Sequence, residues 1–170
     1  MTQATASDED FAVFVATRQR RLQQTAWLLT SDSGQAEDLV QDTLAKMWRH
    51  WSRVQRVGDP DAYVHRVLIN TFISSRRRRW WAERPSDSVP EIAAGAGRDT
   101  DVRLSVAEAL QRLPRKQRAV VVLRFYADLS VEQVAAVLDL PTGTVKSTSS
   151  KALDQLRQDP SIHALVEERP

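Results

Sequence analysis

The sequence predicts an all-α protein of two small helical domains, which a flexible linker joins. Apolar residues recur at helical spacings through both halves of the chain. Between the halves, residues 83–101 hold two prolines, two glycines and few large apolar residues, which is linker composition. Near the C-terminus, a tight turn separates two short helical patterns. We therefore place the domains at residues 1–82 and 103–170, joined by residues 83–102, with a helix-turn-helix in the second.

The composition is typical of a soluble, helix-rich chain. Of the 170 residues, 42% are hydrophobic and 27% are charged. Because cysteine is absent, disulfides and thiolate metal sites are excluded, and we expect neither a metal nor a cofactor. The first residues lack the basic start and apolar run of a signal peptide, and no stretch approaches the ~18 apolar residues of a membrane span. We therefore expect a cytoplasmic protein without a membrane span.

Charge is unevenly distributed along the chain, although the net charge is only +2. Residues 1–43 carry seven acids and three arginines, whereas residues 44–84 carry ten basic residues and three acids. For nucleic-acid partners, such a distribution matters more than the total charge. The basic segment therefore indicates a polyanionic partner.

The first two helices are expected at residues 10–30 and 35–51, because the sequence SDSGQ breaks the apolar pattern between them. The apolar stripe of the first helix consists of Phe11, Phe14, Val15, Leu22, Ala26 and Leu29. The stripe of the second helix consists of Leu39, Val40, Leu44, Met47, Trp48 and Trp51. Acids gather near the start of the second helix, where the helix dipole favours negative charge.

A third helix is expected at residues 62–81, with Asp59 or Asp61 as its cap and Pro60 near its first turn. The spacing predicts an apolar face made of Tyr63, Val67, Leu68 and Phe72. The other face is then expected to carry Arg66, Asn70, Thr71, Ser74 and the arginines at 76–79.

The second half begins with a helix at residues 102–113, which Pro114 ends. Residues 115–127 contain a valine run with strand propensity, but Ala119, Val122, Leu123 and Tyr126 also form a helical stripe. No partner strand exists nearby, so we expect a helix.

The strongest local signal is at residues 129–157. Ser130 and Gln133 form a capping box that opens one helix, and Thr142 is expected to cap a second helix after a tight turn. The inward face of the second helix is predicted to consist of Val145, Ser149, Ala152 and Leu156. Lys146, Ser147, Ser150, Lys151 and Asp154 are then expected to face outward, which suits contacts with DNA. A plain helical hairpin with a solvated polar face is the alternative.

Three ordered segments, at residues 36–51, 61–79 and 113–147, resemble the extracytoplasmic-function class (group IV) of bacterial RNA polymerase sigma factors. The similarity covers roughly residues 11–157 and is greatest to the actinobacterial SigE-like group. It implies that the first domain binds core polymerase and melts the −10 promoter element. The second domain would recognise the −35 element.

The resemblance implies that the second helix binds a coiled coil of the largest polymerase subunit, and that the flap region of the polymerase is also contacted. The implied coiled-coil contacts are Glu37, Asp38, Gln41, Asp42, Met47 and Trp48. Anionic side chains beside an apolar stripe suit a basic, amphipathic partner helix. Acids that only stabilise the helix dipole would explain Asp38 equally well.

For the −10 element, the resemblance implies contacts from the third helix. These residues are Arg66, Asn70, Thr71, Ser74, Arg76, Arg77, Arg78 and Arg79. Asn70 would help to hold a flipped base, and the arginines would bind backbone phosphates. For Trp80 and Trp81, base stacking and core packing both remain open, with packing favoured.

For the −35 element, the implied contacts are Thr142, Thr144, Lys146, Ser147, Ser150 and Lys151. An anti-sigma factor is a further possible partner. The sequence shows no glycine-rich phosphate loop, nucleophile elbow or paired-histidine metal motif, so we do not expect an enzyme. The remaining alternative is a helix-turn-helix regulator that binds duplex DNA without polymerase.

Overall fold

The computed structural model describes the backbone of residues 2–79 and 98–167, and side chains within 8–74 and 100–163. Across these ranges every regular element is a helix, which confirms the predicted class. No helix in the described part of the chain is long and apolar enough to cross a membrane. Residues 80–97, which include Trp80, Trp81 and most of the predicted linker, lie outside the description.

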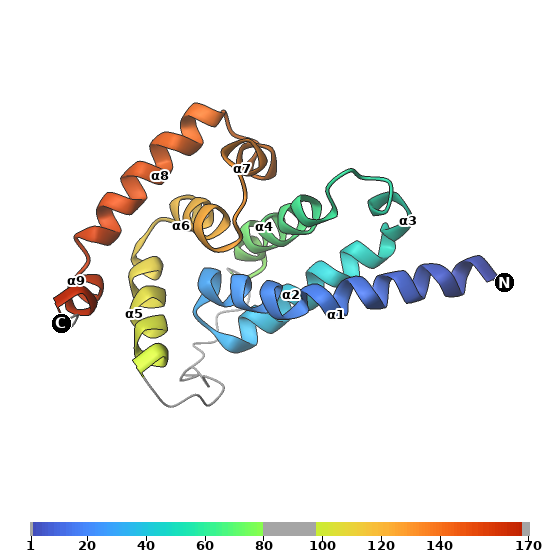
Figure 1. The fold of residues 1–170 in the computed structure, drawn as a ribbon, viewed down its shortest axis with the longest axis horizontal. Coiled ribbons are helices and arrows are strands. Elements are labelled where there is room, and N and C mark those ends of the chain that lie inside the picture. Colours follow the sequence, from blue (N-terminus) through green and yellow to red (C-terminus); the bar gives the residue numbers. More distant parts are fainter. Residues whose placement is uncertain (1, 80–97, 168–170) are drawn as a thin grey trace.

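The first half contains four helices, α1 (Thr2–Thr30), α2 (Ser33–Arg49), α3 (Trp51–Val54) and α4 (Pro60–Arg79). Helix α2 packs against both α1 and α4, as Figure 1 shows. Helix α1 begins eight residues before the predicted start, because no glycine or proline interrupts the preceding sequence.

The second predicted helix is divided in the structure, so the expected continuous helix to residue 51 is wrong. Helix α2 ends at Arg49, and His50 leaves helical geometry with φ −122° and ψ 18°. The N–H of His50 still donates to the carbonyl of Met47, at 3.1 Å. Trp51 then starts α3 and packs its ring against Phe11 and Phe14, with ring centroids 5.1 and 5.0 Å apart. Burial of this aromatic cluster positions α3 against the first half of α1.

The second half follows as a chain of shorter helices. The predicted helix at 115–127 is confirmed, but it widens into a π-helical segment in which the N–H of Ala127 donates to the carbonyl of Val122 at 3.0 Å. Helix α5 starts before residue 102, so the end of the predicted linker is helical. The elements are α5 (Arg98–Arg112), α6 (Arg115–Val121), η1 (Val122–Tyr126), α7 (Val131–Leu138), α8 (Thr142–Arg157) and α9 (Pro160–Glu167).

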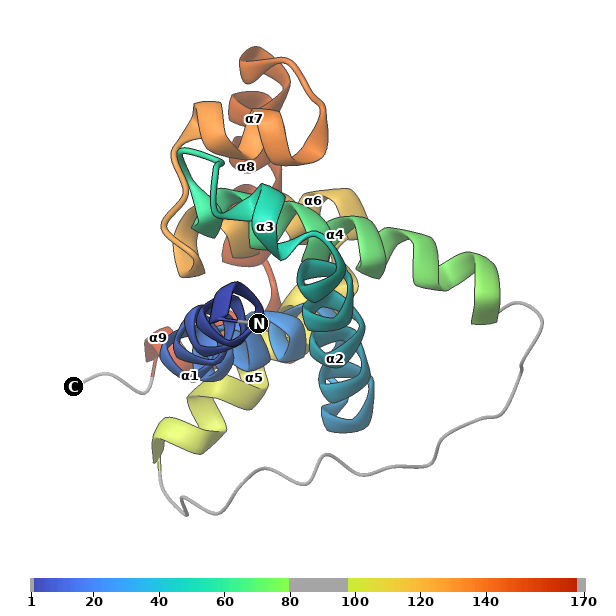
Figure 2. The same ribbon diagram turned by 90° about the vertical axis from the view of Figure 1, so that its right-hand side faces the viewer.

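The two halves pack against each other through one contiguous apolar core. Helices α5, α6 and η1 contact α1, and α7 contacts α4. Figure 2 shows α7 and α8 on the far side of α4 from α1, with the C-terminal end of α4 projecting beyond the other helices. Fully buried members from both halves include Leu22, Met47, Leu68, Leu123 and Val134.

Candidate functional site

Helices α7 and α8 form the predicted helix-turn-helix. The capping box of α7 is present, because the N–H of Gln133 donates to Ser130 Oγ at 3.1 Å and the N–H of Ser130 donates to Gln133 Oε1 at 2.7 Å. Asp139 ends the helix in the left-handed conformation with φ 54°, which makes the turn tight. The prediction that Thr142 caps α8 is wrong, because Pro141 occupies the cap and Thr142 is the first helical residue.

Helix α8 divides into a buried and an exposed face as its spacing predicts. Val145 and Ala152 are fully buried, and Ser149 and Leu156 are half-buried. The exposed side chains include every residue expected at the −35 element: Thr142, Thr144, Lys146, Ser147, Ser150 and Lys151. The outward face therefore presents two cations and several hydroxyl groups, a set that suits phosphates and base edges.

Helix α4 starts at the predicted cap, because Asp59 Oδ1 accepts from the N–H of Ala62 at 2.9 Å. Arg66, Asn70 and Ser74 are exposed on one side of the helix. Together they form an open polar surface where −10 contacts were expected.

Thr71 does not belong to that surface, which corrects the prediction. Its side chain is 4% exposed; its hydroxyl donates to the carbonyl of Val67 at 2.7 Å and accepts from Lys46 Nζ at 2.8 Å. Position 71 turns toward α2 because it lies on the same side of the helix as the buried Val64 and Leu68, seven and three residues before it. The arginines at 76–79 have helical backbone within α4, and their side chains lie outside the described residues.

Helix α2 exposes the four polar residues expected to contact polymerase. Glu37, Asp38, Gln41 and Asp42 are exposed. Trp48 is 46% exposed, with its ring centroid 5.0 Å from that of Phe11. Met47 is fully buried, so its expected direct contact with a partner is wrong; α1 and α4 close over this part of α2. The remaining face combines three carboxylates with one partly exposed aromatic ring.

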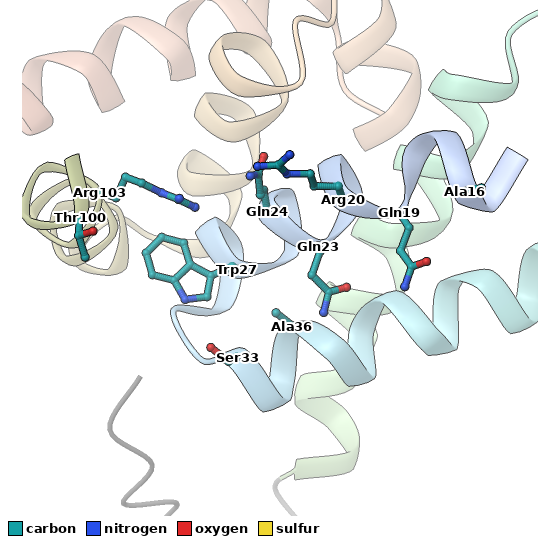
Figure 3. A pocket seen from close by; sticks show the side chains of 10 residues that line it. All are labelled: Ala16, Gln19, Arg20, Gln23, Gln24, Trp27, Ser33, Ala36, Thr100 and Arg103. Carbon is teal, nitrogen blue, oxygen red and sulfur yellow. The ribbon is translucent and has the colours of Figure 1, made fainter. Parts of the chain in front are cut away.

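A hollow of about 660 Å³ lies between α1, α2 and α5. Figure 3 shows Arg103 of α5 pointing toward the Trp27 ring among the lining side chains; the guanidinium carbon is 5.8 Å from the ring centroid. The ten residues that line the hollow include no histidine and no acid. It therefore lacks an acid–base pair, and helices α1 and α2 of the first half face α5 of the second half across it.

His65 and Asp61, near the junction of the halves, have shifted pKa values. Burial lowers the pKa of His65, whose Nδ1 lies 2.6 Å from the carbonyl oxygen of Asp61. The hydrogen bond from Arg18 lowers the pKa of the Asp61 carboxyl. His65 therefore favours the neutral state while Asp61 favours the charged state.

Sequence analysis missed Arg118, which is 7% exposed although it is cationic. Burial, together with the positive charge of Arg115, lowers its pKa. The one sequence signal is its position beside the apolar run AVVVL, which places a cation next to core residues.

A helix-turn-helix with an exposed polar recognition helix, beside a long basic helix, defines a DNA-binding protein. Residues 14–82 match the sigma-70 region 2 family, and residues 109–158 match the sigma-70 region 4 family. The RNA polymerase sigma-E factor of Streptomyces coelicolor is 36% identical over 156 residues, which cover 88% of this chain and 85% of the relative. The chain therefore belongs to the extracytoplasmic-function sigma factors, which direct transcription initiation.

Two further comparisons agree with this assignment. The ECF RNA polymerase sigma factor SigL of Mycobacterium tuberculosis is 34% identical over 139 residues, with 76% of each chain covered. A solved structure of the sigma factor RpoE from Bartonella quintana, in complex with the anti-sigma factor NepR, superposes with a TM-score of 0.73. It is 27% identical and covers 95% of this chain and 99% of that chain, so the similarity includes both helical halves.

Proposed function

We propose that this chain divides the work of a sigma factor among three helices. The acidic face of α2 binds the coiled coil of the largest polymerase subunit, α4 captures the −10 element, and α8 docks in the major groove at the −35 element. The observation that carries this proposal is the exposed polar face of α8, which lies opposite the buried Val145 and Ala152. The first half of the chain matches sigma-70 region 2 and the second half matches region 4, the order that the proposal requires. The flap region of the polymerase is the partner expected for the second half.

At the −10 element, we assign Asn70 to a flipped base and Arg66 and Ser74 to neighbouring contacts. Their exposure along one side of α4 supports this assignment. The arginines at 76–79 are assigned to phosphates, where they supply salt-dependent affinity rather than sequence choice. The protein acts in the cytoplasm, where polymerase and chromosome meet.

An anti-sigma factor is the regulatory partner we propose. The support is the solved RpoE structure, which contains the anti-sigma factor NepR and which this chain resembles over both halves. Such a partner would hold the sigma factor away from polymerase until a stimulus releases it.

The assignment of α2 is tested by charge reversal at an exposed acid. Asp38→Lys should weaken binding to core polymerase at least tenfold, because it places a cation against a basic partner helix. Glu108→Lys, an equal reversal at an exposed position of α5, is the matched control and should bind normally. Co-purification with core polymerase measures both variants. Stable binding of duplex DNA by a wild-type chain that never associates with core polymerase would instead indicate the regulator alternative.

A further inference from the structure

The hollow between α1, α2 and α5 is a cavity that the proposed function leaves unused. Its volume of about 660 Å³ lies within the range of small-molecule pockets, roughly 300–1,000 Å³. The residues that α2 contributes to it, Ser33 and Ala36, are small, which leaves space beside the longer side chains of α1 and α5. None of the ten lining residues belongs to the surfaces that we assign to polymerase or to promoter DNA. A ligand in the hollow would therefore meet none of the residues assigned to transcription initiation.

Two arginines make the hollow positively charged. Arg20 of α1 and Arg103 of α5 line it together, and no acid is among its lining residues. Figure 3 shows the two side chains extending toward each other from their helices. Within the part of the chain whose side chains are described, neither guanidinium forms an ion pair, whereas Arg21, the next residue of α1, lies 3.6 Å from a carboxylate oxygen of Asp128. An anion in the hollow would therefore meet two cations that no described carboxylate neutralises.

The positive potential of these arginines is also felt at Tyr126, next to the hollow. The hydroxyl of Tyr126 donates to Gln24, which is a lining residue. Burial raises the pKa of this hydroxyl, and the charges of Arg103, Arg21 and Arg20 act against that rise. Arg20 and Arg103 therefore act on the same neighbourhood, although they come from different halves of the chain.

The hollow also offers an aromatic face. The Trp27 ring lines it, and the guanidinium carbon of Arg103 lies 5.8 Å from the ring centroid. The side chain of Trp27 is half-buried, so core packing holds the ring while part of it remains accessible. A flat ligand ring can stack on such a surface, as bases stack on the aromatic side chains of single-strand-binding proteins. Because Arg103 lies beside this ring, a stacked ligand would bring its anionic group close to a cation.

Glutamine amides supply hydrogen-bonding groups near the ring. Gln19 and Gln23 lie one turn apart on α1 and line the hollow, and Figure 3 shows both projecting toward α2. In the described part of the chain neither amide has a hydrogen-bond partner. An amide both donates and accepts, which matches the mixed donors and acceptors on the edge of a nucleobase. These groups favour a heterocyclic ring over a plain hydrocarbon ring.

We infer that the hollow binds a nucleoside di- or triphosphate, with the phosphates on Arg20 and Arg103 and the base against Trp27. A bare phosphate would use the guanidiniums but neither the ring nor the amides, and an uncharged aromatic ligand would leave the two cations without an anion. A nucleotide uses all three features, and a guanidinium binds phosphate oxygens through parallel hydrogen bonds. The inference concerns a ligand of the free chain, and it does not rest on the proposed function.

Calorimetric titration of the full chain with ATP tests the phosphate contacts. We choose about 0.15 M salt, where weak binding to other exposed cations is screened. One molecule of ATP should bind per chain. Arg20→Glu and Arg103→Glu lie at exposed positions and should each weaken binding about tenfold or more, because each replaces a phosphate donor with a like charge. Arg53→Glu, an equal reversal at an exposed position of α3, is the matched control and should bind ATP as the wild type does.

Variants of Trp27 test the base. Trp27→Leu should weaken ATP binding roughly tenfold but leave the weaker binding of pyrophosphate unchanged, because only ATP carries a base that can stack. Trp27→Phe keeps an aromatic face and should recover most of the affinity, which separates stacking from packing. Circular dichroism checks that each variant is folded before titration.

ATP binding that both reversals weaken and the control retains supports the inference. Absence of ATP binding by the wild-type chain, or an equal loss in Arg53→Glu and Arg20→Glu, would overturn it. Equal affinity for pyrophosphate or for a hexaglutamate peptide would also overturn the nucleotide assignment, because neither of these anions carries a base.

Discussion

Helices α4 and α8 both have polar faces suited to DNA, but the protein holds them differently. Helix α8 buries Val145 and Ala152, and the contacts on its outward face are local, such as the hydrogen bond from Ser147 Oγ to the carbonyl of Thr144 at 3.1 Å. Helix α4 is held by side-chain contacts from two other helices, α2 and α6. Lys46 of α2 binds Thr71, and the guanidinium carbon of Arg115 of α6 lies 4.7 Å from the centroid of the Phe72 ring.

This difference indicates how each helix can be used. The face of α8 is already formed and open, so duplex recognition should depend on the second half alone. The position of α4 depends on helices from both halves, so −10 capture should respond to the arrangement of the whole molecule. Recognition of the −35 element would then depend on the second half alone, and recognition of the −10 element would depend on how both halves are arranged.

The largest expected effect comes from removing both cations of α8. The double variant Lys146→Ala, Lys151→Ala should lose about two phosphate contacts, so the slope of log affinity against log salt concentration for −35 binding should become shallower. At 0.1 M salt the same loss should lower the affinity roughly sixtyfold. Titration of duplex DNA at several salt concentrations measures the slope and the affinity together. Lys116→Ala, at an exposed position of α6, is the control. Loss of polymerase binding in the double variant would contradict the separate role of α8.

Asn70→Ala should have the next largest effect, and it tests α4. We expect about a tenfold decrease in open-complex formation on a natural promoter, because a flipped base would lose its proposed polar partner on α4. A promoter already melted at −10 should relieve most of the defect, while polymerase binding stays unchanged. An equal defect on both promoters would mean that Asn70 has no role in melting.

Thr71→Val distinguishes packing from DNA contact on the same helix. The variant keeps the shape of the side chain but removes its hydrogen bonds to Val67 and Lys46, so stability should fall by about 1 kcal/mol. Urea unfolding measures the loss. Promoter melting by the folded variant should match that of the wild type. A melting defect as large as that of Asn70→Ala would instead indicate that Thr71 contacts DNA.

Much of the fold followed from local spacing, because each helix carries its own apolar stripe and its own start and stop residues. The capping box of Ser130 and Gln133 was predictable since both partners lie within one turn. Spacing placed Met47 in an apolar stripe, and only the family resemblance made it a contact with polymerase. Thr71 was placed on the polar face of its helix, because spacing alone does not show how many neighbours cover a helix. Helix α2 packs mainly against α1 and α4, and α4 packs mainly against α2 and α7, which leaves each a narrower exposed face than one stripe predicts.

The junction of the halves could not be predicted from spacing. Arg118 is 89 residues from Leu29, and no local pattern links a cation to a backbone carbonyl so far away. Rules of composition place arginine at the surface, so its burial here depends on carbonyls that only the folded chain brings together. The partners of the surfaces, by contrast, came from family resemblance, since exposed polar residues do not name what they bind.

The smallest expected effects concern how the two helices of the helix-turn-helix begin. Ser130→Ala removes the acceptor of the Gln133 N–H and should cost about 1 kcal/mol of unfolding free energy. Thr142→Ala should change stability by only about 0.3 kcal/mol, because Thr142 makes no capping bond and Ala is a good helix former. Urea unfolding of both variants measures the difference, and equal losses would place a cap at Thr142. Since α7 supports α8, the Ser130 variant should weaken −35 binding only near its unfolding transition. Loss of the exposed Thr142 hydroxyl should weaken −35 binding in the fully folded protein, if the proposed contact with DNA is made.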